Sequence, residues 1–166
     1  MKINIASVIR NEGAVKQFSG NVELGTFDFM GSTLEFKTPL CVEGAIHNIG
    51  GTLEISAHIT GEYLTTCSRC GAEVKETLAA ELFESIGDDF SELDEECIVV
   101  SGNVIDISGS IEACIFGSIP MQFLCKEDCK GLCPICGTDL NKNECNCEDE
   151  VYDPRFAIFR NLSKEV

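Results

Sequence analysis

Six of the eleven cysteines of this chain lie within the twenty-three residues from Cys125 to Cys147. Their spacing is C-x3-C-x3-C-x2-C-x8-C-x-C, and the residues between them are rich in glycine, asparagine and lysine. A segment of this composition cannot bury enough apolar surface to offset the conformational entropy that it loses on ordering. Covalent or coordinate bonds to sulfur must therefore hold the segment together.

Two copies of a C-x-x-C-G motif indicate that these bonds go to metal ions. One copy runs from Cys133 to Gly137 inside the cluster, and the other runs from Cys67 to Gly71, far upstream. The spacing lets a tight turn aim both thiolates at one ion, and the glycine permits a positive φ angle. We therefore predict zinc, in two structural sites. The candidate ligands are Cys67, Cys70, Cys125, Cys129, Cys133, Cys136, Cys145 and Cys147.

These ligands can be grouped in three ways. The preferred grouping joins Cys67 and Cys70 to Cys125 and Cys129, and the last four cysteines then form a second site. A rival grouping pairs the two C-x-x-C-G motifs with each other, as zinc ribbons do, and a third has a single site with the remaining thiols free. Iron is the alternative metal, because cysteine alone also binds iron–sulfur centres.

The sequence has no run of eighteen apolar residues, and its start, MKINIASVIRNEG, lacks the features of a signal peptide. We therefore expect a cytoplasmic protein without a membrane partner. In that reducing compartment clustered cysteines are more often metal ligands than disulfides, and an odd number of cysteines cannot all pair. The other three cysteines stand singly among apolar residues, so free, buried thiols are expected at Cys41, Cys97 and Cys114.

Alternating apolar residues predict a β-rich α+β fold. Strands are expected at residues 2–9, 27–36, 40–49, 51–64, 72–82, 97–100 and 103–107. Gly50 and Gly51 suit a tight hairpin turn, and the first C-x-x-C-G motif falls at the tip of the next hairpin. We predict an antiparallel sheet with two short helices and a cysteine-clipped C-terminal region. The chain then divides into a β-rich domain, residues 1–120, and a cysteine cluster with a helix packed on the same domain, residues 121–166.

The first of these helices is expected at residues 109–119, with Asp106 or Ser108 as its cap, and the second at residues 153–162, where the apolar residues form a stripe. The segment after the first expected strand, residues 11–20, is expected to be a polar connection or a short helix.

Residues 81–96 carry eight carboxylates and no basic residue. A charge run of this kind is typical of a solvated loop, and a docking surface for a basic partner is the alternative.

The formal net charge of the chain is −16, and a zinc ion bound by four thiolates would add about −2 for each site. Such a chain is repelled by phosphate backbones and attracted to basic proteins. Eight of its twelve basic residues lie at or beyond the first C-x-x-C-G motif. They either offset nearby thiolates and carboxylates or form a patch that contacts RNA, with Arg69, Lys126 and Lys130 as its candidates.

The sequence contains no nucleophile–base pair, phosphate-binding loop or metal site with an open position. We therefore expect a protein that is not an enzyme and has no small-molecule substrate. His47 and His58 have no partner at metal-binding spacing, so we expect ordinary strand side chains at both positions. The alternative is a thiol-redox or electron-transfer protein, but a redox C-x-x-C usually begins a helix, whereas Cys67 is expected to follow a strand.

The motifs CSRCG and DCKGLCPICGTDLNKNECNCE, together with DPRFAIFRNL after them, resemble the Gram-positive branch of the YceD family. The likeness extends over nearly the whole chain and is loosest in the N-terminal strands. It implies a cytoplasmic role in large-subunit ribosome assembly and rRNA accumulation, with a basic ribosomal protein or the large-subunit rRNA precursor as partner. Other branches lack much of the terminal cluster, which fits a structural role for the metal. The resemblance supports the eight cysteines as ligands and assigns no catalytic residue.

Overall fold

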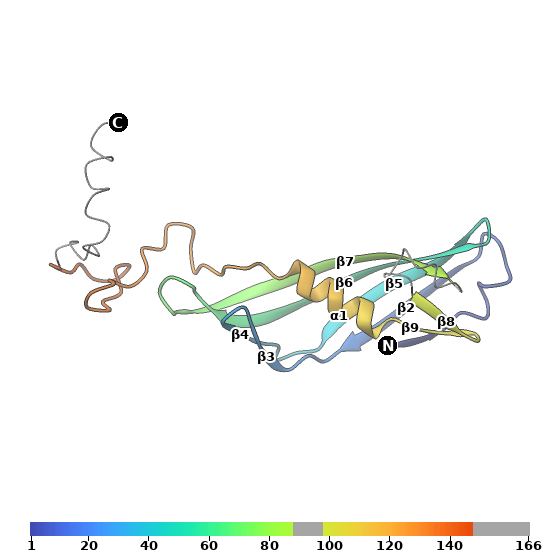
Figure 1. The fold of residues 1–166 in the computed structure, drawn as a ribbon, viewed down its shortest axis with the longest axis horizontal. Coiled ribbons are helices and arrows are strands. Elements are labelled where there is room, and N and C mark those ends of the chain that lie inside the picture. The colour runs from blue at the N-terminus through green and yellow to red at the C-terminus, as the bar shows by residue number, and fades with distance from the viewer. Residues whose placement is uncertain (88–97, 148–166) are drawn as a thin grey trace, which may run out of the picture.

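The computed structural model describes residues 1–87 and 98–147, which form a long, curved sheet with one helix against it (Figure 1). The strands are β1 (Lys2–Asn4), β2 (Val15–Val22), β3 (Thr26–Phe29), β4 (Ser32–Glu35), β5 (Leu40–Ile49), β6 (Thr52–Thr66), β7 (Glu73–Gly87), β8 (Ile98–Ser101) and β9 (Val104–Asp106), and the helix is α1 (Ser108–Ser118). The predicted β-rich fold with antiparallel pairing is confirmed. The second expected helix, at residues 153–162, lies outside the described residues.

The hairpin of β6 and β7 forms the centre of the sheet. Each strand has fifteen residues, and the two pair antiparallel from Leu53 with Ile86 to Thr66 with Glu73. In β6 nearly every second residue is buried and the residues between them face outward, which is the pattern of a strand with one face on the core. At about 3.3 Å per residue such a strand is about 50 Å long. The hairpin therefore carries the first C-x-x-C-G motif to one end of the sheet (Figure 1).

Other strands pair with different parts of this hairpin. β5 joins the first part of β6 through the predicted turn at Gly50 and Gly51, whose φ angles are 61° and 91°. β2 pairs with the other side of β5, and the β3–β4 hairpin meets β6 near its end, at Leu64. The end of β7 pairs in parallel with β8, and β9 and β1 follow as antiparallel neighbours.

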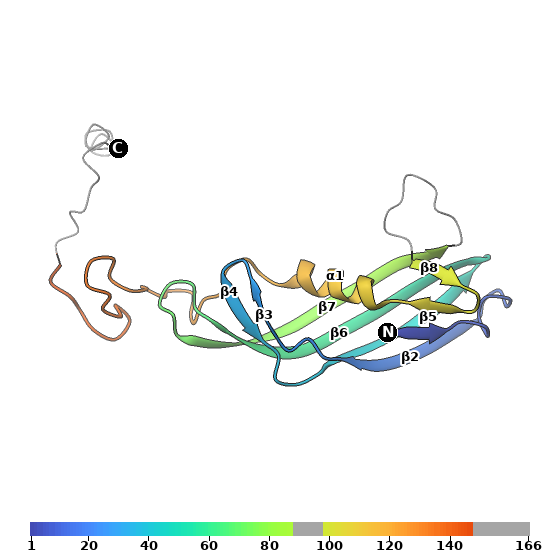
Figure 2. The same ribbon diagram turned by 60° about the horizontal axis from the view of Figure 1, so that its bottom comes forward.

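Helix α1 covers one face of the sheet (Figure 2) and buries Ile111 and Ile115 in a single apolar core with the inner faces of the strands. Its N-cap residue is Ile107, which has no side-chain acceptor, so neither expected cap stands at that position. Instead, Oδ1 of Asp106 accepts a hydrogen bond from the backbone N of Ser108 at 3.1 Å. No helix in the described part of the chain has the length and apolar composition needed to cross a membrane.

Two expectations about local structure are wrong. Most of residues 11–20 belongs to strand β2, because residues 15–22 pair with β5 along their whole length and Phe18 lies opposite Gly44. Residues 81–87 are not a loop but the end of β7, where Leu82 and Ile86 are buried on the core face. The remainder of the acidic run lies outside the described residues.

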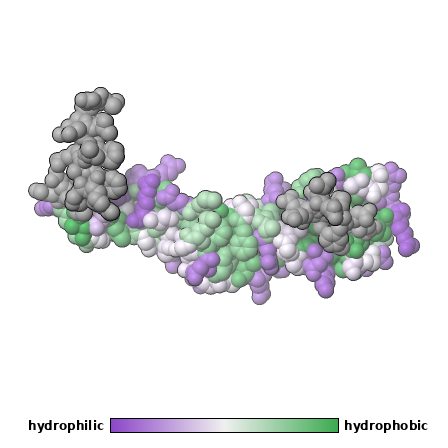
Figure 3. Space-filling view, viewed as in Figure 1, coloured by the Kyte–Doolittle hydropathy of each residue, from purple (hydrophilic) through white to green (hydrophobic). Residues whose placement is uncertain are grey.

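Apolar surface gathers over α1 and the β3–β4 hairpin in the middle of the molecule (Figure 3). Met30, at the hairpin turn, is 68% exposed, and Phe116 of α1 is 39% exposed. The Phe116 ring packs edge-to-face on Phe27, with centroids 5.4 Å apart. The helix is thus held to the hairpin by aromatic contacts that extend to the surface.

Candidate metal centres

The sulfurs of four cysteines meet at the tip of the β6–β7 hairpin and lie within 4.8 Å of one another. We call this set the first sulfur group: Cys67, Cys70, Cys125 and Cys129. Its Sγ–Sγ separations include 3.8 Å between Cys67 and Cys129 and 3.6 Å between Cys70 and Cys125. Around a tetrahedral zinc ion with Zn–S bonds of about 2.3 Å, neighbouring sulfurs are about 3.8 Å apart. The group has the dimensions of a four-sulfur metal site.

A tight turn at the hairpin tip positions the first two sulfurs. The backbone N of Cys67 donates to the O of Ala72 at 2.8 Å, and the N of Gly71 donates to the O of Cys67 at 2.9 Å. Gly71 has a φ of 70°, a left-handed conformation that glycine adopts without strain. The motif therefore turns the chain at the end of β6 and presents both thiols on the same side.

Two hydrogen bonds fasten the segment after α1 to this turn. The backbone N of Ser68 donates to the O of Phe123 at 2.8 Å, and the N of Phe123 donates to Oγ of Ser68 at 3.2 Å. The Phe123 side chain is 2% exposed and packs edge-to-face on Tyr63 of β6, with ring centroids 6.0 Å apart. Phe123 thus anchors the chain two residues before Cys125 and brings that ligand to the hairpin tip.

A second sulfur group follows along the chain, and its sulfurs also lie within 4.8 Å of one another. It comprises Cys133, Cys136, Cys145 and Cys147. The backbone N of Cys133 donates to the O of Thr138 at 2.8 Å, and the N of Gly137 donates to the O of Cys133 at 2.9 Å. Gly137 has a φ of 72°. The two C-x-x-C-G motifs therefore form the same hydrogen-bonded turn.

Arg69 connects the hairpin tip to the chain between the two sulfur groups. Its Nη1 donates to the O of Cys129 at 2.9 Å, and its own backbone O accepts from the N of Leu132 at 3.1 Å. Gly131, with a φ of 75°, passes so close that a Cβ at this position would lie 2.9 Å from the O of Arg69. Arg69 therefore supports the architecture of the first sulfur group directly.

Local hydrogen bonds favour at least one thiolate in each group. Burial opposes the ionisation of Cys67, but hydrogen bonds from backbone amides, that of Cys125 foremost, outweigh it and lower the pKa of the thiol to about 6. The hydroxyl and the backbone amide of Thr138 lower the pKa of Cys136 to about 6, and the Sγ–Oγ1 distance is 3.1 Å. Burial also opposes the ionisation of Cys129, but hydrogen bonds from the backbone of Gly131 and the side chain of Asn141 lower the pKa of this thiol too. Each group therefore contains at least one sulfur that ionises readily.

The neighbouring sulfurs oppose further ionisation. Interaction with Cys129 raises the pKa of Cys125 to about 12, and interaction with Cys136 raises that of Cys147 to about 12. Like charges this close cannot all form unless a cation compensates them. A divalent ion at the centre of each group would supply that compensation, and four thiolates form the closed donor set that structural zinc prefers.

The structure brings the eight cysteines together in the preferred grouping, because the two C-x-x-C-G motifs contribute to different groups. Cys41 is exposed, contrary to the expectation, since its neighbours Leu40 and Val42 point into the core and strand alternation turns it outward. Cys114 is half-buried against the core, and Cys97 lies outside the described residues.

The three residues of the candidate basic patch lie around the first sulfur group, but two of them are engaged within the protein. Arg69 contacts the backbone of Cys129, and Nζ of Lys126 is 3.7 Å from Oδ1 of Asp128. The side chain of Lys130 is exposed. Two of the three candidate side chains thus already have a partner within the protein, which is either a carboxylate or a backbone oxygen.

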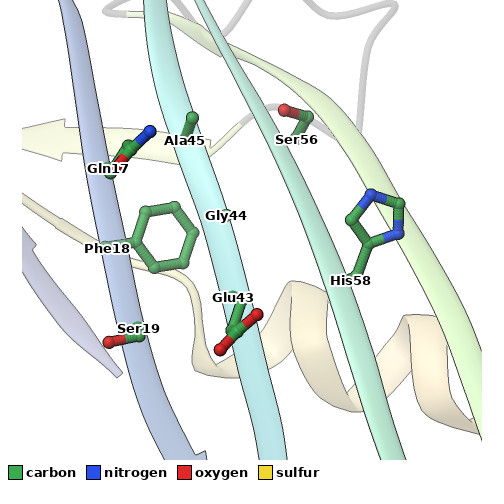
Figure 4. A pocket seen from close by; sticks show the side chains of 8 residues that line it. All are labelled: Gln17, Phe18, Ser19, Glu43, Gly44, Ala45, Ser56 and His58. Carbon is green, nitrogen blue, oxygen red and sulfur yellow. The ribbon is translucent and has the colours of Figure 1, made fainter.

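His58 lines an open hollow of about 670 Å³ on strands β2, β5 and β6, together with Glu43, Ser56 and Gln17 (Figure 4). Nδ1 of His58 is 3.6 Å from Oε1 of Glu81, and both side chains are largely exposed. Exposed pairs of this kind contribute little to stability. Sites for small molecules are usually enclosed and mostly apolar, whereas this hollow is open and its walls are largely polar.

Sequence reasoning missed two residues that position the sulfurs, Phe123 and Asn141. The sequence did contain a signal for Phe123, because a large apolar residue two positions before a candidate ligand can anchor that ligand to the core. Asn141 carries none, because its contact with Sγ of Cys129, at 3.4 Å, joins a polar loop to another part of the structure.

The family model of the large ribosomal RNA subunit accumulation protein YceD matches residues 55–163, which include all eight cysteines of the two groups. An uncharacterised protein of Mycobacterium tuberculosis is 31% identical over 171 residues, covering 95% of this chain and 78% of the relative. The uncharacterised protein YlbN of Bacillus subtilis is 29% identical over 153 residues, covering 90% of this chain and 88% of the relative.

The large ribosomal RNA subunit accumulation protein YCED homolog 1 of Arabidopsis thaliana, a chloroplastic protein, is 36% identical over 62 residues. That alignment covers 37% of this chain and 19% of the relative. No solved structure matches the chain. The similarity to the two bacterial relatives, unlike that to the plant protein, therefore extends over most of both chains.

Proposed function

Since this chain belongs to the YceD family, we propose that it is a non-catalytic, zinc-stabilised factor that supports the accumulation of large-subunit ribosomal RNA. The observation that carries the proposal is the pair of four-sulfur groups. Both groups lie in the residues that match the family model, and this family is named for the accumulation of large-subunit ribosomal RNA. Four cysteine ligands leave no open coordination position for water or substrate, so an ion bound there would be structural.

We propose a basic ribosomal protein as the direct partner. The net charge of −16 favours association with a basic surface and disfavours contact with a phosphate backbone. Two lysines near the sulfurs already face protein carboxylates: Nζ of Lys126 lies 3.7 Å from Oδ1 of Asp128, and Nζ of Lys142 lies 3.0 Å from Oδ2 of Asp139. The large-subunit rRNA precursor is the alternative partner, and the exposed Lys130 side chain, which forms no ion pair within the described residues, is its candidate contact.

Binding measurements with the two partner classes test this proposal. We expect the purified chain to bind basic ribosomal proteins with an affinity that falls as salt is added, because charge attraction is screened. The double variant Lys126→Gln/Lys130→Gln should bind them no more weakly than the wild type, and Lys37→Gln provides a matched control away from the sulfurs. Arg69 is left unchanged because its contacts support the first sulfur group.

The outcome that favours the alternative is tight binding of precursor RNA to the wild type. The Lys126→Gln/Lys130→Gln variant should then bind this RNA more weakly, and the Lys37→Gln variant should not. In that case the RNA, and not a basic ribosomal protein, is the direct partner. If neither a basic ribosomal protein nor precursor RNA binds, the proposed function fails. Elemental analysis should find about two zinc ions per chain in a colourless protein. Iron with a visible band that bleaches on reduction would instead favour the electron-transfer alternative.

A further inference from the structure

The side chain of Asn141 connects the loop of the second sulfur group to a ligand of the first. Asn141 lies between Cys136 and Cys145 in the chain, and both of these belong to the second group. Its Nδ2 nevertheless donates to Sγ of Cys129, in the first group, at 3.4 Å. In the described residues no other side chain from the second group's loop donates to a sulfur of the first group.

The orientation of this amide is set by its other contacts. Nδ2 also donates to Oδ1 of Asp139 at 3.0 Å, and Oδ1 of Asn141 accepts from the backbone N of Lys130 at 2.9 Å. A reversed amide would place its oxygen against Cys129 and its N–H groups against the N–H of Lys130. Only one orientation satisfies all three neighbours, so a hydrogen-bond donor is directed at the sulfur.

The loop that presents Asn141 is held by backbone contacts. The O of Asp139 accepts from the N of Lys142 at 3.1 Å and from the N of Asn143 at 3.0 Å, and the N of Leu140 donates to the O of Gly131 at 3.0 Å. The loop is polar and has no core of its own. Its order therefore depends on the ligands of the second group that close it on both sides, and an ion that draws them together lowers the entropy lost on ordering.

We propose that Asn141 is a positioning residue that couples the two sites, so that metal binding at the second sulfur group strengthens metal binding at the first, and the reverse. This inference rests on the proposed zinc sites. Closing the second site holds the amide donor at Cys129, where it stabilises the negative charge of a ligating thiolate. Linkage then requires the effect to be equal in both directions. Loss of an outer contact of this kind typically lowers metal affinity about 10–100-fold.

Titration of the full, reduced chain with Co²⁺ tests the coupling, because cobalt bound by four thiolates absorbs visible light. Chelator competition gives the affinities, and native mass spectrometry counts the ions per chain. The double variant Cys145→Ser/Cys147→Ser removes the second site and keeps every ligand of the first. We expect its first site to bind Co²⁺ about tenfold more weakly than in the wild type. In the Asn141→Ala background, removing the second site should cause no further loss.

Three variants at two asparagines isolate the contact. Asn141→Ala should weaken the first site about 10–100-fold and increase the fraction of chains that carry one ion. Asn143→Ala is the matched control, because this exposed side chain makes no hydrogen bond within the described residues, and it should behave as the wild type. Asn141→Asp retains an acceptor for the N of Lys130 but directs a carboxylate at Cys129, so it should weaken the first site even if the alanine variant disorders the loop.

The coupling is overturned if the wild-type chain loads its two sites independently, or if Asn141→Asp binds Co²⁺ as tightly as Asn143→Ala. In either case two ions would still bind, and the proposed function would stand. A chain that binds no metal would overturn both the coupling and the zinc-stabilised function.

Discussion

At the scale of single residues, two glycines with nearly the same backbone conformation have different surroundings. Gly131 has a φ of 75° and Gly137 a φ of 72°. A Cβ at position 131 would lie 2.9 Å from the backbone O of Arg69, whereas a Cβ at position 137 would meet no atom within 4 Å. A backbone oxygen cannot move aside as a flexible side chain can. Glycine is therefore required at position 131 for two reasons, the positive φ angle and the close approach of the Arg69 backbone oxygen.

The variants Gly131→Ala and Gly137→Ala should separate these two effects. The free energy of unfolding of each variant should fall by about 1–2 kcal/mol, because an L-residue is strained at this φ angle. In Gly131→Ala the free energy of unfolding should fall by about 1–3 kcal/mol more, because the methyl group displaces the chain from Arg69. We expect a lower midpoint of thermal unfolding and a weaker first metal site in Gly131→Ala than in Gly137→Ala. Equal effects in the two variants would show that the close approach to Arg69 does not matter.

At the scale of secondary-structure elements, a row of aromatic rings joins the sheet, the helix and the cysteine region. Phe27 of β3 stacks on Phe36, Phe36 packs on Tyr63 of β6, and Tyr63 packs on Phe123, with centroid distances of 5.8, 5.2 and 6.0 Å. Phe27 also contacts Phe116 of α1. Phe123 stands at the end of this row, where the chain leaves the apolar core for the first sulfur group.

Phe123→Ala should destabilise the protein by about 3–5 kcal/mol, because it removes a buried ring and leaves a cavity beside Tyr63. It should also weaken the first metal site, since the chain before Cys125 loses its anchor. Phe83→Ala is the matched control: Phe83 is 71% exposed, so the change should stay within about 0.5 kcal/mol. Urea unfolding of both variants gives the comparison, and similar losses in the two would refute the anchoring role.

At the scale of the whole molecule, two kinds of interaction stabilise two parts of the chain. Among the described residues, the buried apolar core begins at Ile3 and ends at Phe123. The chain from residue 124 to 147 contributes nothing to that core, and its buried side chains are Cys129 and Cys133. Burial of apolar surface stabilises the sheet and helix, whereas coordination of the sulfurs would stabilise the rest.

If zinc binds the two sulfur groups as proposed, removing it should unfold residues 124–147 and leave the sheet and helix folded. We expect a strong chelator, under reducing conditions, to abolish the protection of the amides of Cys133 and Leu140 from hydrogen exchange. The amides of the β6–β7 hairpin near Ile55 should stay protected, and the far-ultraviolet signal of the sheet should persist. The same chelator saturated with zinc is the control. Loss of both regions together would mean that the sheet also depends on the metal.

The sequence by itself determined the features that depend on near neighbours in the chain. Alternation of apolar residues predicted the long strand through Ile55, and the Gly50–Gly51 pair predicted its turn, because strand period and turn conformation are local properties. The spacing of the C-x-x-C-G motifs predicted the two turns that aim the sulfurs. The same motifs, together with the DPRFAIFRNL segment that follows them, indicated the family.

Only the tertiary structure decided which sulfurs meet. The first sulfur group forms because Phe123 contacts Ser68, 55 residues earlier in the chain, and brings Cys125 with it. Pairing with β5 made a strand of the polar segment around Phe18, and the contact of Asn141 with Cys129 crosses between two loops. Residue spacing defines what a short segment can do, but contacts between distant segments depend on how the apolar core packs.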